Sequence, residues 1–549
     1  MAETSPPASP FSIPLYRSLW LANLVSNLGY VIQSVGAAWL MTEIARSPAM
    51  VALVQTSTSL PIMLLALLSG AIADSFDRRR VMLVAQGLML FVSLALVFLS
   101  ASDLITPYLL LGFTFLIGCG MALNSPAWQA TVGDIVPKPV LPAAVAYNSI
   151  AFNVARSGGP AIGGAIVAAA GSAAAFAVNC FSYLPLIAVL LRWKVPPTDE
   201  ELPPERIGNA VTSGLRYFVM SPHHLVVIAR SAIFAISASA VTALMPVIAR
   251  DIIGGGALIY GLLLGAFGAG AVGGAFASAR LRRSLSIERI VAIASLLIAI
   301  GAAGTALSGS LFTAMPALAL AGCGWILGMS TLNVTIQLAS PRWVVARAIS
   351  VQQTAIFGGM ALGSWLFGIA ADNLGIPLAL AICAALHLGS IIVGRFLPLP
   401  EFEDLNLDPL RRWTTPDTAV PVEARNGPVA VSILYRVAPA DVPEFLNEMR
   451  QWRRVRRRDG ARRWALYRDL ADPELWIERY HVSTWLEYVR HNQRRTHADS
   501  GFRERIFALH KGPGQPEVHR MLEVHPAHYV EVQPGSDGFV ARDYNEHAS

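Results

Sequence analysis

Long apolar segments separated by short polar ones make up most of the first 400 residues. A bilayer-spanning helix needs about 20 predominantly apolar residues. Such segments lie at 16–42, 50–73, 80–101, 107–131, 142–169, 173–192, 224–249, 257–279, 287–307, 311–337, 344–370 and 376–397. The pattern predicts twelve transmembrane helices in two bundles of six, 16–192 and 224–397, after an N-terminal tail at 1–15. A polar loop at 193–223 separates the bundles, because its Pro- and Glu-rich run at 195–204 would not be stable in lipid.

Composition supports lipid as the solvent of this part. The chain has 549 residues, of which 54% are hydrophobic and 14% charged, whereas soluble domains have about 25% charged residues. The last 129 residues hold 20 of the 42 Lys and Arg and 18 of the 36 Asp and Glu. The preceding residues therefore carry too few charges to cover a large soluble domain.

Loop charges predict the orientation. With the N-terminus inside, the inner loops carry fourteen Lys and Arg, and the outer loops carry only Arg46 and Arg250. Because basic residues accumulate in cytoplasmic loops, we expect a multi-pass protein of the plasma (inner) membrane with both termini cytoplasmic. The net charge of +6 then reflects orientation in the lipid membrane and does not indicate a nucleic-acid partner.

The two predicted bundles share sequence features at equivalent positions. Gly-Cys-Gly at 118–120 in the fourth span recurs at 322–324 in the tenth, and the glycine-rich segment at 158–164 in the fifth matches 358–364 in the eleventh. Paired six-helix repeats are typical of transporters that bind a substrate between the repeats near the middle of the bilayer.

The connection between the second and third spans resembles a motif of the major facilitator superfamily, GxxxDRxGRRR. Its first glycine, its acid and its arginine run are kept as Gly70, Asp74, Arg78, Arg79 and Arg80. Ser75 and Asp77 depart from the pattern. The resemblance implies a gating loop; the alternative is that the arginines only set the topology.

A second motif, Gly159-Pro160-x-x-Gly163-Gly164, resembles the GPxxGG core of export-type members of the superfamily. It implies a closely packed hinge, with simple helix packing as the alternative. The sequences around Asn153 and at 245–251 are similar to those of the transmembrane secretion effector group. That resemblance implies export of a siderophore-, drug- or secondary-metabolite-like small molecule by alternating access.

Arg156 lies near the middle of the fifth span, where a charge costs about 3 kcal/mol on insertion scales. We expect it to face a central cavity and attract an anionic or polar substrate. The alternative is a structural arginine bonded to helix carbonyls or to Asn23, Asn27 or Asn153. Arg230, two turns into the seventh span, is expected to extend to the inner surface.

The predicted substrate cavity combines this arginine with amides, which suit a substrate rich in oxygen acceptors. Interhelical hydrogen bonding is an equally good interpretation of the amides. The predicted residues are Arg156, Asn23, Asn27, Gln129, Asn153, Asn333 and Gln352.

The expected energy source for transport rests on the family resemblance more than on individual residues of this chain. The chain has no GxxxxGK[ST] loop, which argues against direct use of ATP. Proton coupling is expected from the family, but no acid lies in the middle of a span. The coupling candidates are Glu43 and His387, with Asp74 as a further acid; His387 is more typical of a hydrogen-bonded helix residue.

The last part of the chain reads as a linker at 398–428, an α+β domain at 429–530 and a tail at 531–549. Strand patterns at 429–437, 463–468 and 474–482, and helices at 441–458 and after Ser483 as N-cap, follow the ferredoxin-like order. The domain also resembles the small dimeric α+β barrels of the antibiotic-biosynthesis-monooxygenase type, which implies a possible homodimer. The arginines at 453–458 are expected to form a solvated helix face, or to contact anionic lipid.

Together these features predict an all-α major facilitator fold of twelve helices with a small cytoplasmic ferredoxin-like domain. We expect a transporter with no catalytic residue, cofactor or metal. The alternatives are a membrane-anchored enzyme or ligand sensor acting through the C-terminal domain, and import of the substrate in place of export.

Overall fold

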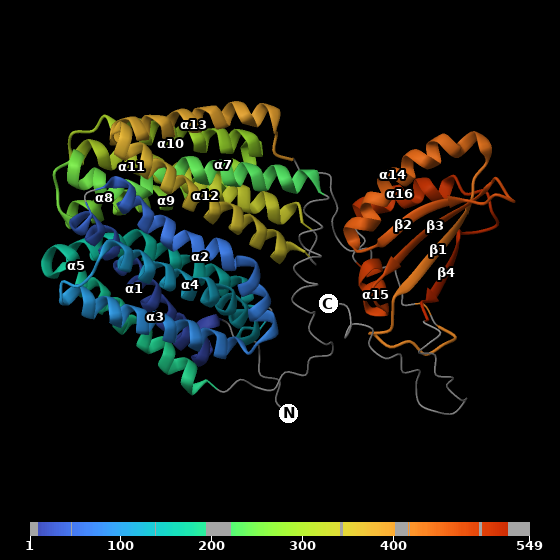
Figure 1. Ribbon diagram of the computed structural model, residues 1–549, viewed down its shortest axis with the longest axis horizontal. Coiled ribbons are helices and arrows are strands. Elements are labelled where there is room, and N and C mark those ends of the chain that lie inside the picture. The colour runs from blue at the N-terminus through green and yellow to red at the C-terminus, as the bar shows by residue number, and fades with distance from the viewer. Residues whose placement is uncertain are drawn as a thin grey trace. The chain divides into compact units, whose positions relative to one another are not determined.

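The computed structural model (Figure 1) describes residues 9–45, 47–137, 139–193, 221–340, 344–400, 416, 418–493 and 497–524. The chain forms two compact units, one with the long helices and one that contains Phe402–Ser549. Most of the predicted N-terminal tail, central loop and linker, and all of the tail at 531–549, lie outside the described residues.

The helical unit contains a series of long apolar helices. The first group is α1 (Pro14–Ile44), α2 (Pro48–Ser75), α3 (Arg78–Ala101), α4 (Pro107–Ile135) and α5 (Leu141–Arg192). The second is α7 (Pro222–Ala243), α8 (Met245–Val247), η2 (Ile248–Ile252), α9 (Ala257–Ser284), α10 (Ile287–Ala306), α11 (Leu311–Leu338), α12 (Val345–Leu374) and α13 (Ile376–Phe396).

Helix α5 supplies two of the predicted spans. Its 52 residues would extend about 78 Å if straight, against a hydrocarbon core of about 30 Å. Gly171 is the one residue inside α5 with non-helical dihedrals, φ 78° and ψ 172°, and glycine adopts positive φ without steric cost. The break agrees with the predicted spans 142–169 and 173–192. The described residues hold eleven helices long and apolar enough to cross a membrane, so α5 counted twice gives the predicted twelve.

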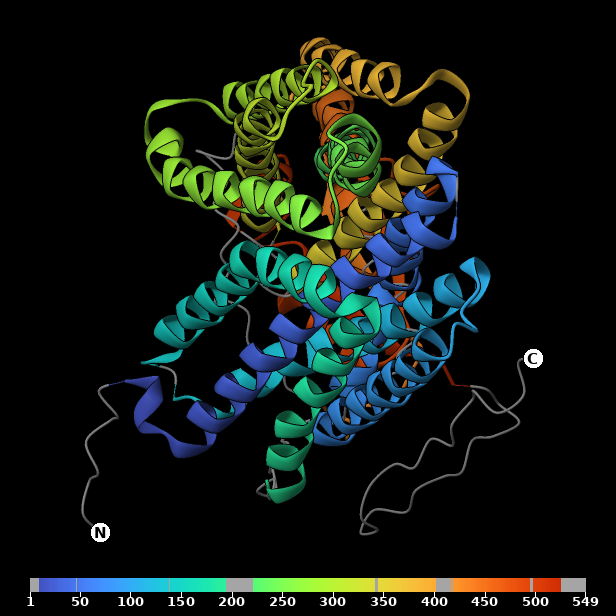
Figure 2. The ribbon, with the colours of Figure 1, turned by 90° about the vertical axis from the view of Figure 1, so that its left-hand side faces the viewer.

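The two groups of helices form two bundles (Figures 1 and 2). Equivalent glycines of the two bundles pack in equivalent ways. Gly118 packs against α2 and Gly322 against α9, each the second long helix of its bundle. Gly120 packs against α3 and Gly324 against α10, each the third. The predicted repeat is therefore present in the packing as well as in the sequence.

The C-terminal unit is an antiparallel sheet with helices packed on it. Its elements are β1 (Val429–Arg436), α14 (Val442–Asp459), β2 (Arg462–Arg468), β3 (Leu475–Val482), α15 (Trp485–Gln493), α16 (His497–Ala508) and β4 (Glu517–Leu522). The strand order β2-β3-β1-β4 is that of the predicted ferredoxin-like plan. Helix α15 begins one residue later than predicted, because the hydroxyl of Thr484, and not of Ser483, accepts from the backbone nitrogen of Glu487 at 3.2 Å.

The prediction of a solvated arginine face on α14 is wrong at one position. Arg456 is 3% exposed and forms an ion pair with Glu478 of β3, with Nε and Oε1 3.0 Å apart. Arg454 and Arg457 are exposed, as predicted. Phe445 lies on the hydrophobic face of α14, which packs in the core. Residue 456 is three turns further along the same face, so Arg456 is buried as well.

Candidate functional site

The two bundles meet closely where α5 packs against α9. A Cβ placed on Gly164 would lie 2.7 Å from the carbonyl oxygen of Ala257, and one on Gly261 would lie 2.7 Å from the carbonyl oxygen of Pro160. Further along, a Cβ on Gly268 would lie 3.1 Å from the carbonyl oxygen of Arg156. The backbones of α5 and α9 therefore approach to a distance that only glycine permits.

A second pair of helices, α2 and α12, joins the bundles in the equivalent way. The Thr56 hydroxyl of α2 donates to the carbonyl oxygen of Ala361 at 2.9 Å. A Cβ on Gly368 of α12 would lie 2.8 Å from the Ala52 side chain. Helix α5 contains span five and α9 is span eight, while α2 and α12 are spans two and eleven. In two six-span repeats, span five corresponds to span eleven and span two to span eight. The repeat therefore relates one helix pair to the other.

Polar contacts join the bundles at the end where α1 meets α2 and α12 meets α13; we call them the interbundle cluster. The Asp372 carboxylate accepts from the Ser47 hydroxyl at 2.5 Å and from the backbone nitrogen of Ala49 at 3.3 Å. Arg250, paired with Asp251, donates to the carbonyl oxygen of Thr42 at 2.5 Å. Asp372 thus lies at the positive N-terminus of α2, which favours a carboxylate.

Arg156 lies on the α5–α9 contact, midway between Leu141 and Gly171. Its side chain is partly exposed, and Tyr30 of α1 is an electrostatic neighbour. Arg156 is thus a partly buried arginine in the middle of a span, at the contact between the bundles.

The predicted amides of the first bundle have different environments. Asn23 and Asn27 of α1 are partly buried, and the Asn27 amide donates to the carbonyl oxygen of Asn23 at 2.9 Å. Gln129 of α4 is exposed and donates to the Ser125 hydroxyl at 3.4 Å. The side chain of Asn153 lies outside the described residues.

In the second bundle, Asn333 of α11 is partly buried, and Gln352 of α12 is completely buried. The Gln352 amide donates to the Ser231 hydroxyl of α7 at 3.1 Å. This contact lies inside one bundle and is the interhelical hydrogen bond that was the alternative interpretation of the amides.

Sequence reasoning missed a polar cluster inside the first bundle. The Ser93 hydroxyl donates to the Gln33 amide oxygen at 2.8 Å, and the Asn179 amide nitrogen contacts both this oxygen and the Tyr183 hydroxyl, the latter at 2.8 Å. All four side chains are buried. The only available signal was that these polar residues lie at similar depths in neighbouring spans.

Two arginines of the predicted gating loop bind helix ends of their own bundle. Arg78 forms an ion pair with Asp134 of α4. Arg79 donates from Nε to the carbonyl oxygen of Leu190 at 2.7 Å and from Nη2 to that of Leu191 at 3.1 Å. The loop therefore ties α3 to the ends of α4 and α5.

The other residues of the loop differ from one another. The Arg80 side chain is 84% exposed and 3.6 Å from Asp77. Asp77, where the motif has glycine, is the N-cap of α3 and accepts from the nitrogen of Arg79 at 2.9 Å. A Cβ on Gly70 would meet no atom within 4 Å. Asp74 is helical, and its side chain lies outside the described residues.

The predicted hinge lies between one helix of its own bundle and one of the other. Gly159 and Gly163 face α1, where added Cβ atoms would lie 2.8 Å from Val31 and 3.1 Å from Ile32. Pro160 and Gly164 face α9. The dihedrals of α5 stay helical through the motif, so close packing is what the structure shows here.

The two coupling candidates lie in different settings. Glu43 is exposed and accepts from Trp39 Nε1 at 2.7 Å, and the Trp39 ring stacks on Tyr260 of the other bundle with centroids 6.4 Å apart. His387 is completely buried beside Phe234, and its two ring nitrogens have no hydrogen-bond partner among the described residues.

Arg230 is placed differently from the prediction. It is 4% exposed and does not extend to the surface. Its guanidinium pairs with Glu288 at 2.9 Å and donates to the carbonyl oxygen of Leu397 at 3.1 Å, while the backbone nitrogen of Leu399 donates to Glu288 at 3.1 Å. The partners come from the start of α10 and the end of α13, which the span pattern alone does not bring together.

The fold is that of the major facilitator superfamily, a class of multi-pass membrane transporters. A bacterial homologue of the human lysosomal transporter Spinster has a TM-score of 0.54 and 16% identity, covering 71% of this chain and 96% of that one. A POT family transporter has a TM-score of 0.57 and 12% identity, covering 69% and 95%.

Sequence comparison identifies the family within this class. The profile described as transmembrane secretion effector matches residues 5–527, and the chain belongs to that family. The enterobactin exporter EntS of Salmonella typhimurium is 27% identical over 402 residues, which cover 70% of this chain and 92% of EntS. These are transporters and not enzymes, which disfavours the alternative of a membrane-anchored enzyme.

Two other relatives match over shorter regions. The staphyloferrin A transporter of Staphylococcus aureus is 25% identical over 240 residues, which cover 43% of this chain and 60% of that protein. The transporter YfiS of Bacillus subtilis is 29% identical over 188 residues, which cover 32% of this chain and 43% of that protein. Both matches therefore span less than two thirds of the relative.

Proposed function

We propose that this protein exports a small molecule of the siderophore, drug or secondary-metabolite type across the inner membrane. The observation that carries the proposal is the interface between the bundles, where two repeat-related helix pairs meet and Arg156 lies midway along one of them. The relatives named as an enterobactin exporter and a staphyloferrin A transporter support this substrate class.

Transport would proceed by alternating access, with residues 16–192 moving against residues 224–397. If the basic loops are cytoplasmic, the interbundle cluster lies on the outer side, and its contacts must break for the passage to open outward. The cluster is made of a few polar contacts over close-packed glycines, an arrangement that suits rigid-body movement of one repeat against the other.

Arg156 would attract the anionic or polar part of the substrate, and amides nearby would bind its oxygen acceptors. An arginine away from water keeps its charge and offers up to five donors. Asn23, Asn27 and Asn333, which are partly buried, remain in the proposed set, as do Gln129, Asn153 and Gln352. Gln352 would act through helix packing, given its bond to Ser231.

Proton antiport is the coupling that we propose. Of the two candidates, Glu43 is better placed, because its Trp39 partner stacks on Tyr260 across the interface. Protonation of Glu43 would remove the charge that holds the indole nitrogen. His387 would contribute through the packing of the second bundle, beside Phe234.

The test begins with metabolites inside and outside cells that contain or lack the protein. A compound enriched outside when the protein is present is then offered to inside-out vesicles. We expect uptake into the vesicles that depends on a proton gradient and that a protonophore abolishes. Accumulation of the compound inside intact cells would show import and contradict export, and protonophore-resistant uptake would contradict the coupling.

A further inference from the structure

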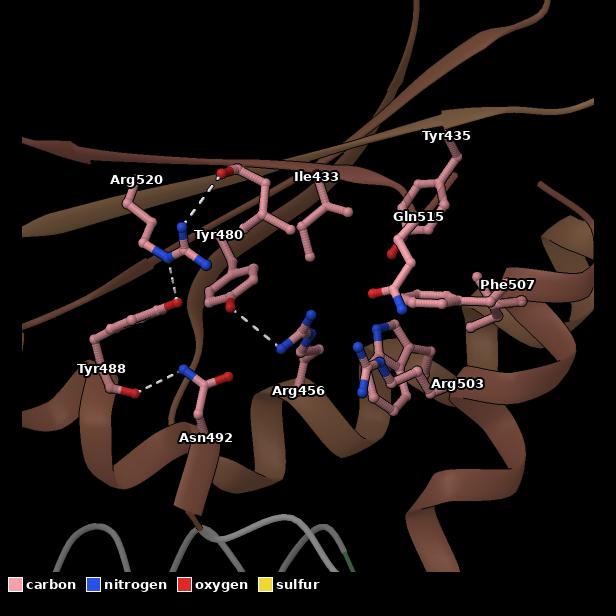
Figure 3. A pocket seen from close by; sticks show the side chains of 13 residues that line it. Ile433, Tyr435, Arg456, Tyr480, Tyr488, Asn492, Arg503, Phe507, Gln515 and Arg520 are labelled. Carbon is pink, nitrogen blue, oxygen red and sulfur yellow. Dashed lines mark hydrogen bonds between the residues drawn. The ribbon is translucent and has the colours of Figure 1, made fainter. Parts of the chain in front are cut away.

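The C-terminal unit has a partly open cavity between its sheet and its helices (Figure 3). Its volume is about 200 Å³, and strands β1, β3 and β4 and helices α14, α15 and α16 contribute to its walls. The export mechanism proposed above uses none of these residues. The proposed export mechanism therefore does not account for this cavity.

A buried arginine lies at the centre of this cavity. Arg456 is 3% exposed, and its guanidinium lies over the rings of Trp452 and Tyr480, 4.8 Å and 4.6 Å from their centroids. Its Nε pairs with Glu478 at 3.0 Å, and its Nη1 lies 3.2 Å from both the Tyr480 hydroxyl and His491 Nε2. The aromatic rings and the ion pair hold the planar donor in one orientation toward the cavity.

Glu478 is fully engaged with groups of the protein. Besides Arg456, it accepts from the Tyr435 hydroxyl at 3.0 Å and from Trp464 Nε1 at 2.9 Å, and it is 0% exposed. It does not line the cavity. The carboxylate therefore balances the charge of one arginine but offers no acceptor to a molecule in the cavity.

Two further arginines line the same cavity, and among the described residues no Asp or Glu does. Arg520 donates from Nε to the Tyr488 hydroxyl at 2.7 Å, and Arg503 lies 4.6 Å from the centroid of the Phe507 ring. Arg503 and Arg520 are exposed to solvent, so with Arg456 balanced by Glu478 they add two positive charges at the rim of the cavity. Partial burial, and then the charge of Arg456, lower the pKa of Arg503, while Tyr435 and Glu504 raise it.

The wall of the cavity also holds a hydrogen-bond donor for which the described residues supply no acceptor. Trp452 is 3% exposed, and its indole nitrogen is buried with no hydrogen-bond partner among the described residues. A buried donor without an acceptor costs free energy. An acceptor atom on a bound molecule would remove that cost.

We propose that this cavity binds a small aromatic carboxylic acid, with its carboxylate on the arginines and its ring among the aromatic side chains. Guanidinium groups bind carboxylates through paired hydrogen bonds, and tyrosine and tryptophan rings stack on flat molecules. The cavity of about 200 Å³ is smaller than drug-sized sites, which measure about 300–1,000 Å³. A single-ring acid therefore suits it better than a multi-ring product.

The experiment uses the full-length purified protein and titration calorimetry with benzoate, with benzamide as a neutral molecule of the same shape. We expect benzoate to bind at least about tenfold more tightly than benzamide, because a hydrogen bond to a charged group is worth more than a neutral one. Arg503→Gln and Arg520→Gln should each weaken benzoate binding by about tenfold or more. Arg456→Gln is avoided, because it would leave Glu478 buried without its ion-pair partner.

Two controls separate this site from other effects. Arg454→Gln removes an exposed arginine from the same helix and should leave benzoate affinity unchanged, as should Arg156→Ala in the helical unit. Equal binding of benzoate and benzamide would overturn the proposal. Unchanged benzoate affinity in the Arg503→Gln and Arg520→Gln double variant would do so as well, whatever the outcome of the export assays.

Discussion

Arg156 combines a charge, a mid-helix position and partial exposure at the bundle interface. If it attracts an anionic part of the substrate, Arg156→Ala should abolish transport while the protein still inserts, and Arg156→Lys should retain part of the rate because it keeps the charge without the forked donors. Uptake by inside-out vesicles measures both. Arg283→Ala, which removes an exposed arginine at the end of α9, is the control, and full activity of Arg156→Ala would remove the residue from the site.

Asp372 lies at the α2 N-terminus, where it accepts two hydrogen bonds from the other bundle. Asp372→Ala should therefore shift the protein toward a state that is open at this end. Spin labels on Leu104→Cys and Leu307→Cys, exposed positions on the α3–α4 and α10–α11 connections, would report a longer distance. Asn373→Ala is matched, because among the described residues the Asn373 amide donates within its own helix, to the carbonyl oxygen of Ile369 at 2.9 Å. An identical distance distribution in the two variants would argue against a role for Asp372 in closure.

At this scale the sequence predicted which residues are unusual but not their partners. The depth of Arg156 and the helix-end position of Asp372 follow from counting along a span. The pairing of Arg230 with Glu288, and of Arg456 with Glu478, depends on the rotation of one helix or strand against another. A single sequence carries no information on that rotation, so both arginines were expected to be solvated.

The helix pairs between the bundles depend on single glycines. Gly164→Ala would place a Cβ 2.7 Å from a carbonyl oxygen of α9, whereas Gly158→Ala, at the residue just before the motif, would meet no atom within 4 Å. Overpacking costs about 1–3 kcal/mol, so Gly164→Ala should lower the unfolding temperature and the transport rate. Gly158→Ala should change neither. Thermal unfolding in detergent and vesicle uptake test this, and equal behaviour of the two variants would be evidence against glycine-dependent packing.

Elements were predicted well where hydrophobic length defines them. The predicted spans 142–169 and 173–192 are separated correctly, although Gly171 itself was not recognised as the break. Motif glycines were less informative, since Gly164 permits close packing and Gly70 has open space around it. Whether a glycine permits close packing depends on the neighbouring helix, and a motif names only one side of the contact.

For the whole molecule, the repeat predicted the architecture, because equivalent glycines contact equivalent helices in both bundles. The contacts used in the proposed transport mechanism all lie before residue 400, and the C-terminal sheet belongs to a separate compact unit. Export should therefore not require the C-terminal domain. The end of α13 is a different matter, because Leu397 and Leu399 complete the buried pair of Arg230 and Glu288.

Two truncations separate these contributions. A chain ending at residue 428 keeps every described contact of the helical unit, so we expect it to insert and export at a rate near that of the full chain. A chain ending at residue 396 loses the carbonyl and amide groups that bind Arg230 and Glu288. A buried ion pair stripped of its hydrogen bonds is costly, so this chain should unfold at a lower temperature. The chain ending at residue 428 could insert and fold but no longer export. In that case the C-terminal domain takes part in transport, and its arginine-lined cavity becomes a candidate for the control of export.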